Sequence, residues 1–220
     1  MAQHQPEVAE SSAEIVRELG PFRAGEHVHG VTYDGKHVWY AAGDRLQSVD
    51  PEHGVPGACI AVVATAGSAF DGRHFYQIAG DRIQKVDAKT GQVLTTIPTP
   101  SPAGQSSGLT WAEGTLWVGQ FQDRSIVQID PDTGRVLKRI QSARFVTGVT
   151  FVDGELWHGT WEDDVSDVRR VDATTGRVLE RLEMPKGASV SGLESDGRDL
   201  LFCGGGRSGK IRAIRRPRRA

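Results

Sequence analysis

Apolar and polar residues alternate in five similar phrases along the chain, and each phrase begins with a glycine. The phrases start at Gly30, Gly67, Gly108, Gly148 and Gly192 and read GVTYDGKHVWY, GSAFDGRHFYQ, GLTWAEGTLWV, GVTFVDGELWH and GLESDGRDLLF. Each contains two apolar runs joined by a glycine turn, a strong hairpin signal because glycine tolerates positive φ. Successive starts lie 37, 41, 40 and 44 residues apart. A period of about 40 residues with several short strands per unit predicts an all-β fold, a five-bladed β-propeller.

Two further strands are predicted in each repeat. The third reads RLQSVD, RIQKVD, SIVQID or DVRRVD, and the fourth reads VLTTI, VLKRI or VLERL. Four-residue turns join them at residues 51–54, 88–91, 131–134 and 173–176. Each blade is therefore expected to contain four antiparallel strands. We expect the aspartate ahead of each turn to cap backbone N–H groups, because the turns lack the ligand series of a calcium loop.

The two ends of the chain are predicted to close the ring together. Residues 14–30 match residues 177–192, so they contain a fourth strand with no first three before it, whereas the last repeat has only three strands. The N-terminal strand would complete the C-terminal blade and so remove exposed sheet edges. We expect a single domain over residues 14–215, a disordered N-terminus over residues 1–13 and a solvated basic tail over residues 216–220. Contact of the terminal RAIRRPRRA with an anionic surface is the alternative.

Composition narrows the partners and the cellular location. The net charge is −2, so no bulk field favours nucleic acid. Residues 1–13 lack the basic and apolar regions of a signal peptide, and no apolar run reaches the length of a membrane span. The two cysteines, Cys59 and Cys203, have no motif spacing, and Cys59 falls on a predicted outer strand. We expect a reduced, cytoplasmic, monomeric protein that binds neither nucleic acid nor membrane.

Candidate chemistry is predicted where the central channel opens at one face. The residues that precede the five glycines meet there, together with the residues that follow each second strand. Bulky and polar side chains gather in the first, third and fourth blades. The predicted catalytic residues are His29 and Glu162. The predicted substrate-binding residues are Trp161, Gln120, Phe121, Thr147 and Arg144.

Some conspicuous residues have structural explanations. Trp39, Trp117 and Trp157 share one repeat position and are expected in the core, and Trp111 is expected to pack. His27 and His29 point to one face of a strand, which suits a metal, but zinc needs three or four ligands. His158 would be the third ligand, three blades away, so we predict no metal and no cofactor. The chain shows no nucleophile elbow, H-E-x-x-H pair or phosphate-binding loop.

The assembled phrases resemble the glutaminyl cyclotransferase family of five-bladed propellers. The matching stretches are HVHGVTYDGKHVWYAAG, TAGSAFDGRHFYQIAG and ELWHGTWEDD with VDATTGRVLERL, and the likeness covers residues 14 to 215. The resemblance implies an acyltransferase that converts N-terminal glutamine to pyroglutamate with release of ammonia.

The family's site residues carry over only in part. The position of its acid/base glutamate is Ala66, and its first-blade glutamine becomes His29. A family asparagine falls at Thr147, and a tryptophan near Ala79 or Gly80 is missing. The later tryptophan is retained as Trp161. The resemblance therefore implies altered activity, with His29 or Glu162 moving the proton.

Two other functions remain open. SGLTWAEGTLWVGQFQDRSIVQIDPDTG is similar to virginiamycin B lyase repeats, which implies a metal-assisted lyase or lactone hydrolase. For such a site the chain offers His27, His29, His158 and Glu194. The third possibility is a non-catalytic propeller that binds a small molecule or a peptide N-terminus in the channel mouth, because propellers host all of these roles.

Overall fold

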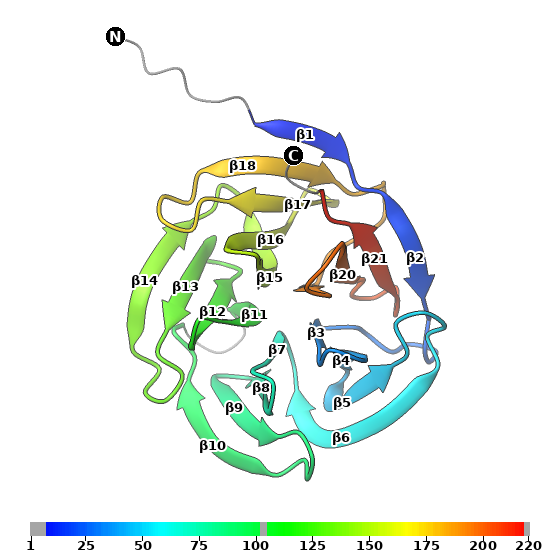
Figure 1. Cartoon of the computed structure of the whole chain (residues 1–220), viewed down its shortest axis with the longest axis vertical. Helices are drawn as coiled ribbons and strands as arrows, with labels where there is room; N and C mark the ends of the chain where they lie inside the picture. The colour runs from blue at the N-terminus through cyan, green and yellow to red at the C-terminus, as the bar shows by residue number, and fades with distance from the viewer. Residues whose placement is uncertain (1–7, 102–104, 218–220) are drawn as a thin grey trace.

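Five small antiparallel sheets stand around a central axis like the blades of a propeller (Figure 1). The computed structural model describes residues 8–101 and 105–217, and within them it contains only strands, turns and loops. It confirms the predicted all-β, five-bladed fold. No helix in the described residues could cross a membrane.

Each blade is built from four strands that follow one another from the axis outward. The first blade contains β3 (Gly30–Tyr33), β4 (Val38–Ala41), β5 (Gly43–Val49) and β6 (Pro56–Ala64). The second contains β7 (Ser68–Phe70), β8 (His74–Ala79), β9 (Arg82–Asp87) and β10 (Val93–Pro98). The third contains β11 (Ser106–Ala112), β12 (Thr115–Gln120), β13 (Ser125–Ile129) and β14 (Val136–Gln141). The fourth contains β15 (Phe145–Val152), β16 (Glu155–Glu162), β17 (Val165–Val171) and β18 (Val178–Glu183).

The fifth blade joins the two ends of the chain. It contains β19 (Gly192–Ser195), β20 (Leu200–Gly204), β21 (Ile211–Arg215) and the N-terminal strand β2 (Ile15–Leu19). The strand β2 runs antiparallel to β21, from the pair Ile15↔Ile214 to the pair Leu19↔Ile211. The predicted closure of the ring by the N-terminal strand is confirmed, and Figure 1 shows β2 as the outermost strand of this blade.

A further N-terminal strand corrects the expectation of a disordered segment. Residues Ala9–Ser12 form β1, which lies parallel to β18 and adds a fifth strand to the fourth blade. Its four side chains are exposed, so backbone hydrogen bonding to the sheet edge holds it rather than apolar burial. The prediction was therefore wrong for residues 9–12, and residues 1–7 lie outside the described part.

The C-terminal prediction of a solvated tail is also wrong where the chain is described. Arg216 is 8% exposed. Its Nη2 donates to Asp153 Oδ2 at 2.5 Å and to the Arg198 carbonyl oxygen at 2.6 Å. The segment after β21 thus folds back across the fourth and fifth blades. The last residues, 218–220, lie outside the described part.

Apolar side chains fill the spaces between neighbouring blades. Five buried clusters are found among the described residues, and each joins two adjacent blades. The three repeated tryptophans belong to them as predicted, with exposures of 5% for Trp39, 5% for Trp117 and 0% for Trp157. Trp111 packs as expected, stacked on Tyr76 with ring centroids 5.3 Å apart, a usual separation for an aromatic pair. Burial between blades makes the ring rigid and positions the strand ends at its two faces.

The repeated glycine has a steric cause. A Cβ atom placed on Gly67 would lie 2.5 Å from the backbone nitrogen of Leu109, and one on Gly148 would lie 2.5 Å from that of Leu193. Each innermost strand makes the same close contact with the next one. The ring closes at Gly192, where an added Cβ atom would lie 2.7 Å from the backbone nitrogen of Val31 in the first blade. The five innermost strands therefore meet in a glycine ring, formed by Gly30, Gly67, Gly108, Gly148 and Gly192, that only hydrogen side chains allow.

The turn aspartates act as backbone caps. Asp130 Oδ1 accepts the backbone N–H groups of Asp132 at 3.1 Å and Thr133 at 2.8 Å. Asp87 and Asp172 make the same pair of contacts in their turns. Hydrogen bonds from the hydroxyl group and the backbone N–H of the turn threonine (Thr90, Thr133 or Thr175) are the main reason that the pKa of each of the three carboxyl groups is lowered. The geometry agrees with the predicted capping role.

Candidate ligand-binding site at the channel mouth

A cavity of about 500 Å³ opens where the channel meets one face of the ring. The residue before each of the five glycines lines it, so all five blades contribute. The lining residues are His29, Thr65, Ala66, Ile78, Gly80, Ser106, Ser107, Phe121, Thr147, Trp161, Ser189, Val190, Ser191 and Gly206. We call this cavity the mouth pocket. Its volume lies within the range that small-molecule sites occupy.

One wall of the mouth pocket is aromatic. Phe121 follows β12, and Trp161 lies in β16 of the next blade, with ring centroids 6.4 Å apart. Phe145 supports both from behind, stacked on Phe121 at 4.7 Å and tilted against Trp161 at 6.3 Å. The guanidinium of Arg124 lies 4.3 Å from the centroid of the Phe145 ring. This stack presents a flat apolar surface to a ligand.

His29 lines the mouth pocket from the first blade. Its backbone N–H donates to the Ala41 carbonyl oxygen at 2.9 Å, which fixes the chain just before β3. Burial, with His27 alongside at a ring distance of 5.6 Å, lowers the pKa of His29 below its ordinary value. The imidazole is therefore neutral at neutral pH, and one ring nitrogen can accept a proton.

Most of the lining hydroxyl groups are turned toward the protein backbone. Ser107 Oγ donates to the Val146 carbonyl oxygen at 2.6 Å, and Ser191 Oγ donates to that of Val28 at 2.5 Å. These bonds join neighbouring blades at the mouth, because donor and acceptor lie in different blades or in the segment that enters one. The hydroxyls thus stabilise the shape of the pocket while leaving its surface largely apolar.

Four of the seven predicted site residues meet in the mouth pocket. They are His29, Phe121, Thr147 and Trp161. The other three, Gln120, Glu162 and Arg144, are not among its lining residues. Successive side chains of a strand point to opposite sides, so Gln120 and Glu162 turn away from the side that their neighbours Phe121 and Trp161 occupy. Gln120 is fully buried, and its Nε2 donates to Ser106 Oγ at 3.0 Å.

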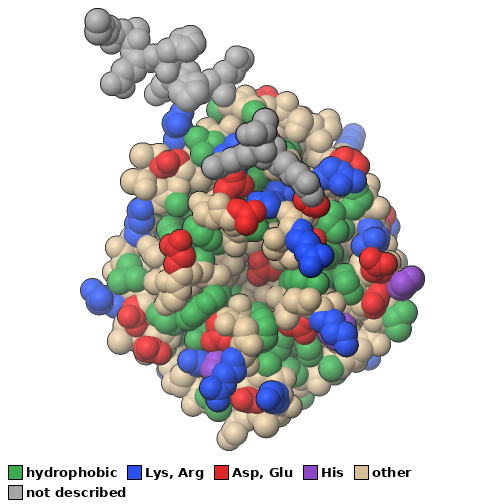
Figure 2. Space-filling model, viewed as in Figure 1, with side chains coloured by type: hydrophobic (Ala, Val, Ile, Leu, Met, Phe, Trp, Pro, Cys, Tyr) green, Lys and Arg blue, Asp and Glu red, His purple; other side chains and the backbone are tan. Residues whose placement is uncertain are grey.

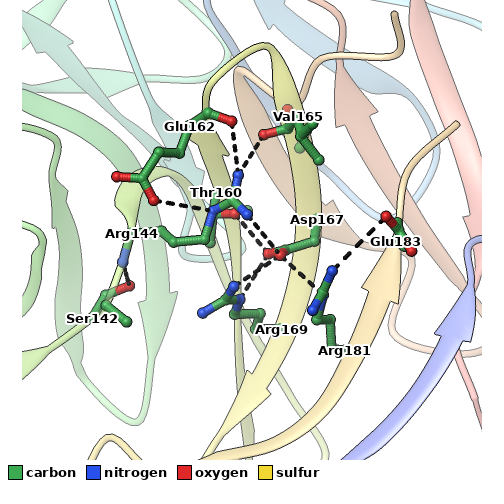
Figure 3. A network of polar contacts seen from close by, with 12 residues as sticks. Ser142, Arg144, Thr160, Glu162, Val165, Asp167, Arg169, Arg181 and Glu183 are labelled. Atoms are coloured by element: carbon green, nitrogen blue, oxygen red, sulfur yellow. Dashed lines mark hydrogen bonds and ion pairs between the residues drawn. The ribbon is translucent and has the colours of Figure 1, made fainter. Parts of the chain in front are cut away.

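Glu162 and Arg144 belong to a polar network at the end of β16 (Figure 3). The Glu162 carboxylate contacts Arg124 at 2.6 Å and Arg144 at 3.8 Å. Arg144 Nη2 also donates to the carbonyl oxygens of Glu162 at 3.0 Å and Val165 at 2.7 Å. In this position the two residues hold the end of β16, which carries Trp161, rather than contact a ligand in the pocket.

The centre of the network is Asp167, which has no exposed side-chain surface (Figure 3). It accepts hydrogen bonds from Thr160 Oγ1 at 2.6 Å and from Arg169 at 2.8 and 2.9 Å. Arg144 and Arg181 lie 3.7 and 3.3 Å away. Burial opposes ionisation of Asp167, but these partners outweigh it and lower the pKa of its carboxyl group. The network thus holds Thr160 and Glu162, the two residues that flank Trp161.

The residues considered for a metal site do not come together. Within the described part of the chain, no group of three or more His, Cys, Asp or Glu side chains could hold a metal ion. His158 is 1% exposed inside the fourth blade, where its Nδ1 lies 3.3 Å from the Gly159 carbonyl oxygen. Glu194 is buried on the other side of Gly192, bonded to Thr32 and Thr150. Neither side chain lines the mouth pocket with His29.

Several residues that line the mouth pocket were not predicted from the sequence. Thr65, Ser106 and Ser189 lie two or three residues before a repeat glycine, and Ile78 lies in a second strand. Thr65 and Ser106 directly precede Ala66 and Ser107, the expected lining residues, so a period-two rule, which puts successive side chains on opposite faces, would have excluded them. Ser189 and Gly206 lie in loops of irregular length, for which the repeat gives no rule.

The face drawn in Figure 2 differs in character from the mouth pocket lining. Lys, Arg, Asp and Glu side chains of both signs are spread over it around a central hollow, with apolar side chains between them. No single charge dominates that view.

Comparisons with known proteins show the fold. No family model matches the chain, and no curated protein matches it by sequence. Among solved structures, the glutaminyl cyclase of Myxococcus xanthus has a TM-score of 0.78 and 19% identity, over 95% of this chain and 98% of that one. The hydrazine synthase of Kuenenia stuttgartiensis has a TM-score of 0.52 and 19% identity, over 82% of this chain and 56% of that one. The chain is therefore a five-bladed β-propeller whose fold is similar to that of a glutaminyl cyclase.

Proposed function

We propose that the protein binds a small molecule, or the terminal residue of a peptide, in the mouth pocket. The observation that carries the proposal is the convergence of His29, Thr147, Phe121 and Trp161, from three blades, on one cavity of about 500 Å³. An apolar concave site with a few polar groups is the usual form of a small-molecule site. The network around Asp167 gives the aromatic wall a fixed position before a ligand arrives.

The glutaminyl cyclase reaction itself is expected to be weak or absent. Cyclisation of N-terminal glutamine requires transfer of a proton from the attacking amine and to the departing ammonia. The resemblance places the acid/base glutamate of that reaction at Ala66, whose side chain ends in a methyl group. Glu162 does not replace it, because its carboxylate is engaged by Arg124 and Arg144.

His29 supports a second, catalytic candidate. It is neutral at neutral pH because burial lowers its pKa, and none of the described residues that line the pocket with it is acidic. Any conversion of a bound ligand would use this imidazole as its general base.

Ligand-observed NMR with a collection of small aromatic and peptide fragments tests the binding function. We expect hits with the unaltered protein that disappear in Trp161→Ala, because the aromatic wall supplies the contact area. Trp111→Ala is the matched control, since Trp111 is also partly exposed but stacks on Tyr76 away from the pocket. Hits that persist equally in both variants would place binding elsewhere and contradict the proposal.

A peptide with N-terminal glutamine tests the catalytic candidate. Pyroglutamate is followed by mass spectrometry with the unaltered protein, His29→Ala and Ala66→Glu. We expect the unaltered protein to match the spontaneous rate. Formation above that rate, lost in His29→Ala, would instead establish a cyclase that uses His29 as its base. A gain in Ala66→Glu alone would show that position 66 is what separates this pocket from the reaction.

A further inference from the structure

Among the described residues that line the mouth pocket, the only ionisable side chain is that of His29. The others are alanine, glycine, valine, isoleucine, serine, threonine, phenylalanine and tryptophan. Because burial lowers the pKa of His29, the pocket has no formal charge at neutral pH. The carboxylate of Glu162, which follows Trp161 in the chain, is held by two arginines, Arg124 at 2.6 Å and Arg144 at 3.8 Å.

Most lining hydroxyl groups already donate a hydrogen bond to an oxygen atom of the protein. Besides Ser107 and Ser191, Thr65 Oγ1 donates to the Ile78 carbonyl oxygen at 3.3 Å and Ser189 Oγ donates to that of Gly205 at 3.0 Å. A ligand therefore meets apolar surface and oxygen lone pairs over most of the cavity. Neither can neutralise an ammonium or a carboxylate group.

Thr147 is different from the other lining hydroxyl residues. It is 7% exposed, and its Oγ1 has no hydrogen-bond partner in the described structure. This oxygen lies over the backbone of Gly159, where an added Cβ would be 2.9 Å away. A buried hydroxyl without a partner loses the free energy of a hydrogen bond. Because Thr147 lines the mouth pocket, we assign this O–H to a ligand acceptor, which requires rotation about the Cα–Cβ bond to another staggered position.

Building on the proposed function, we infer that the mouth pocket selects uncharged, flat molecules that carry a carbonyl group. The flat body lies against Phe121 and Trp161, and the carbonyl oxygen accepts a hydrogen bond from Thr147 Oγ1. A free peptide N-terminus, which carries an ammonium group, is excluded unless it is blocked. Uncharged, flat carbonyl compounds are a narrower class of ligands than the fold alone implies.

The physical basis is the free energy of removing an ion from water. A buried charge without a partner is strongly unfavourable, and the pocket offers none. Interaction of a cation with the aromatic wall would recover only part of that loss. One face of this stack is already taken, because Arg124 lies over Phe145.

Isothermal titration with three indoles of different charge tests the selection near neutral pH. Indole-3-acetamide is neutral, tryptamine is a cation and indole-3-acetate is an anion. We expect the amide to bind at least about tenfold more tightly than either ion. The same series on a benzene ring, phenylacetamide, phenethylamine and phenylacetate, repeats the comparison on a smaller body.

Two variants assign the selection to named residues. Thr147→Val keeps the shape of the side chain and should weaken indole-3-acetamide about five- to tenfold through the lost hydrogen bond. It should leave 3-methylindole, which has no carbonyl group, unchanged. Ala66→Glu adds a carboxylate to the lining and should reverse the preference in favour of tryptamine. Thermal unfolding of both variants checks that the fold is intact.

The outcomes separate the inference from the proposed function. If tryptamine or indole-3-acetate binds as tightly as the amide, the selection for uncharged ligands is wrong while the pocket remains a binding site. If Thr147→Val weakens the amide and 3-methylindole equally, the hydrogen bond to Thr147 is wrong. If no compound of either series binds, the proposed function itself fails.

Discussion

Glu194 is a buried carboxyl group in the channel, two residues beyond the glycine ring. Its oxygens accept hydrogen bonds from Thr32 Oγ1 at 3.2 Å, Thr150 Oγ1 at 2.5 Å and the Ser195 N–H at 2.9 Å. Those hydrogen bonds lower its pKa, but burial acts more strongly and raises the pKa of Glu194 to about 7. No cation lies among the partners that set this value.

This carboxyl group makes stability depend on pH. Between the ordinary pKa of 4.5 and about 7, the folded protein keeps a proton that the unfolded chain releases. The folded state then binds more protons, so its contribution to stability is complete below pH 4.5 and is lost as pH rises through about 7. In Glu194→Gln the side chain stays neutral. We expect the variant to be more stable than the unaltered protein by about 2 to 3 kcal/mol above pH 7.

Urea unfolding of both proteins across this pH range measures the effect. The difference between the two curves isolates Glu194 from other groups such as His158, whose pKa burial lowers to about 4. Two parallel curves with no pH-dependent difference would contradict the buried, protonated carboxyl group.

At the scale of single residues, the sequence predicted position better than orientation. The residues before the repeat glycines were correctly placed at the mouth, because the repeat fixes where each innermost strand begins. Of the predicted residues at the end of each second strand, Phe121 and Trp161 line the pocket, whereas Gln120 and Glu162 do not. Which of two neighbours faces the channel depends on the register of the second strand, and the repeat alone did not resolve it.

At the scale of the secondary-structure elements, the hairpins and the ring closure followed from local signals. Glycine turns between alternating apolar residues marked the paired strands, and the unmatched fourth strand marked β2. The strand β1 gave no such signal. Its sequence, AESS, has no apolar alternation, and it is held by backbone pairing with β18 and by exposed contacts such as Arg181 with Glu10 at 3.3 Å.

Two truncations test how differently these N-terminal strands stabilise the fold. Deleting residues 1–12 removes β1, whose side chains are exposed, so we expect a small decrease in the thermal midpoint. Deleting residues 1–20 also removes β2, which exposes the edge of β21 and removes Leu19, a residue 3% exposed in the core. We expect this longer deletion to cause a much larger loss of stability than the shorter one. Equal midpoints for both truncated proteins would contradict the closure of the ring by β2.

At the scale of the whole molecule, the glycine ring separates crossing points that admit no side chain from a mouth that carries side chains of several kinds. The five innermost strands approach so closely that no Cβ fits at their crossing points. The residues just before them are free of that constraint and here include His29, Ala66 and Thr147. A fold similar to that of a glutaminyl cyclase can therefore coexist with 19% sequence identity.

The most direct measurement of the central claim is a crystal structure of the protein with indole-3-acetamide. We expect density for the indole ring against Phe121 and Trp161, with the amide oxygen near Thr147 and with Thr147 turned into the pocket. Ligand density at the opposite face of the channel or on the outer strands, with the mouth pocket free of ligand, would contradict it.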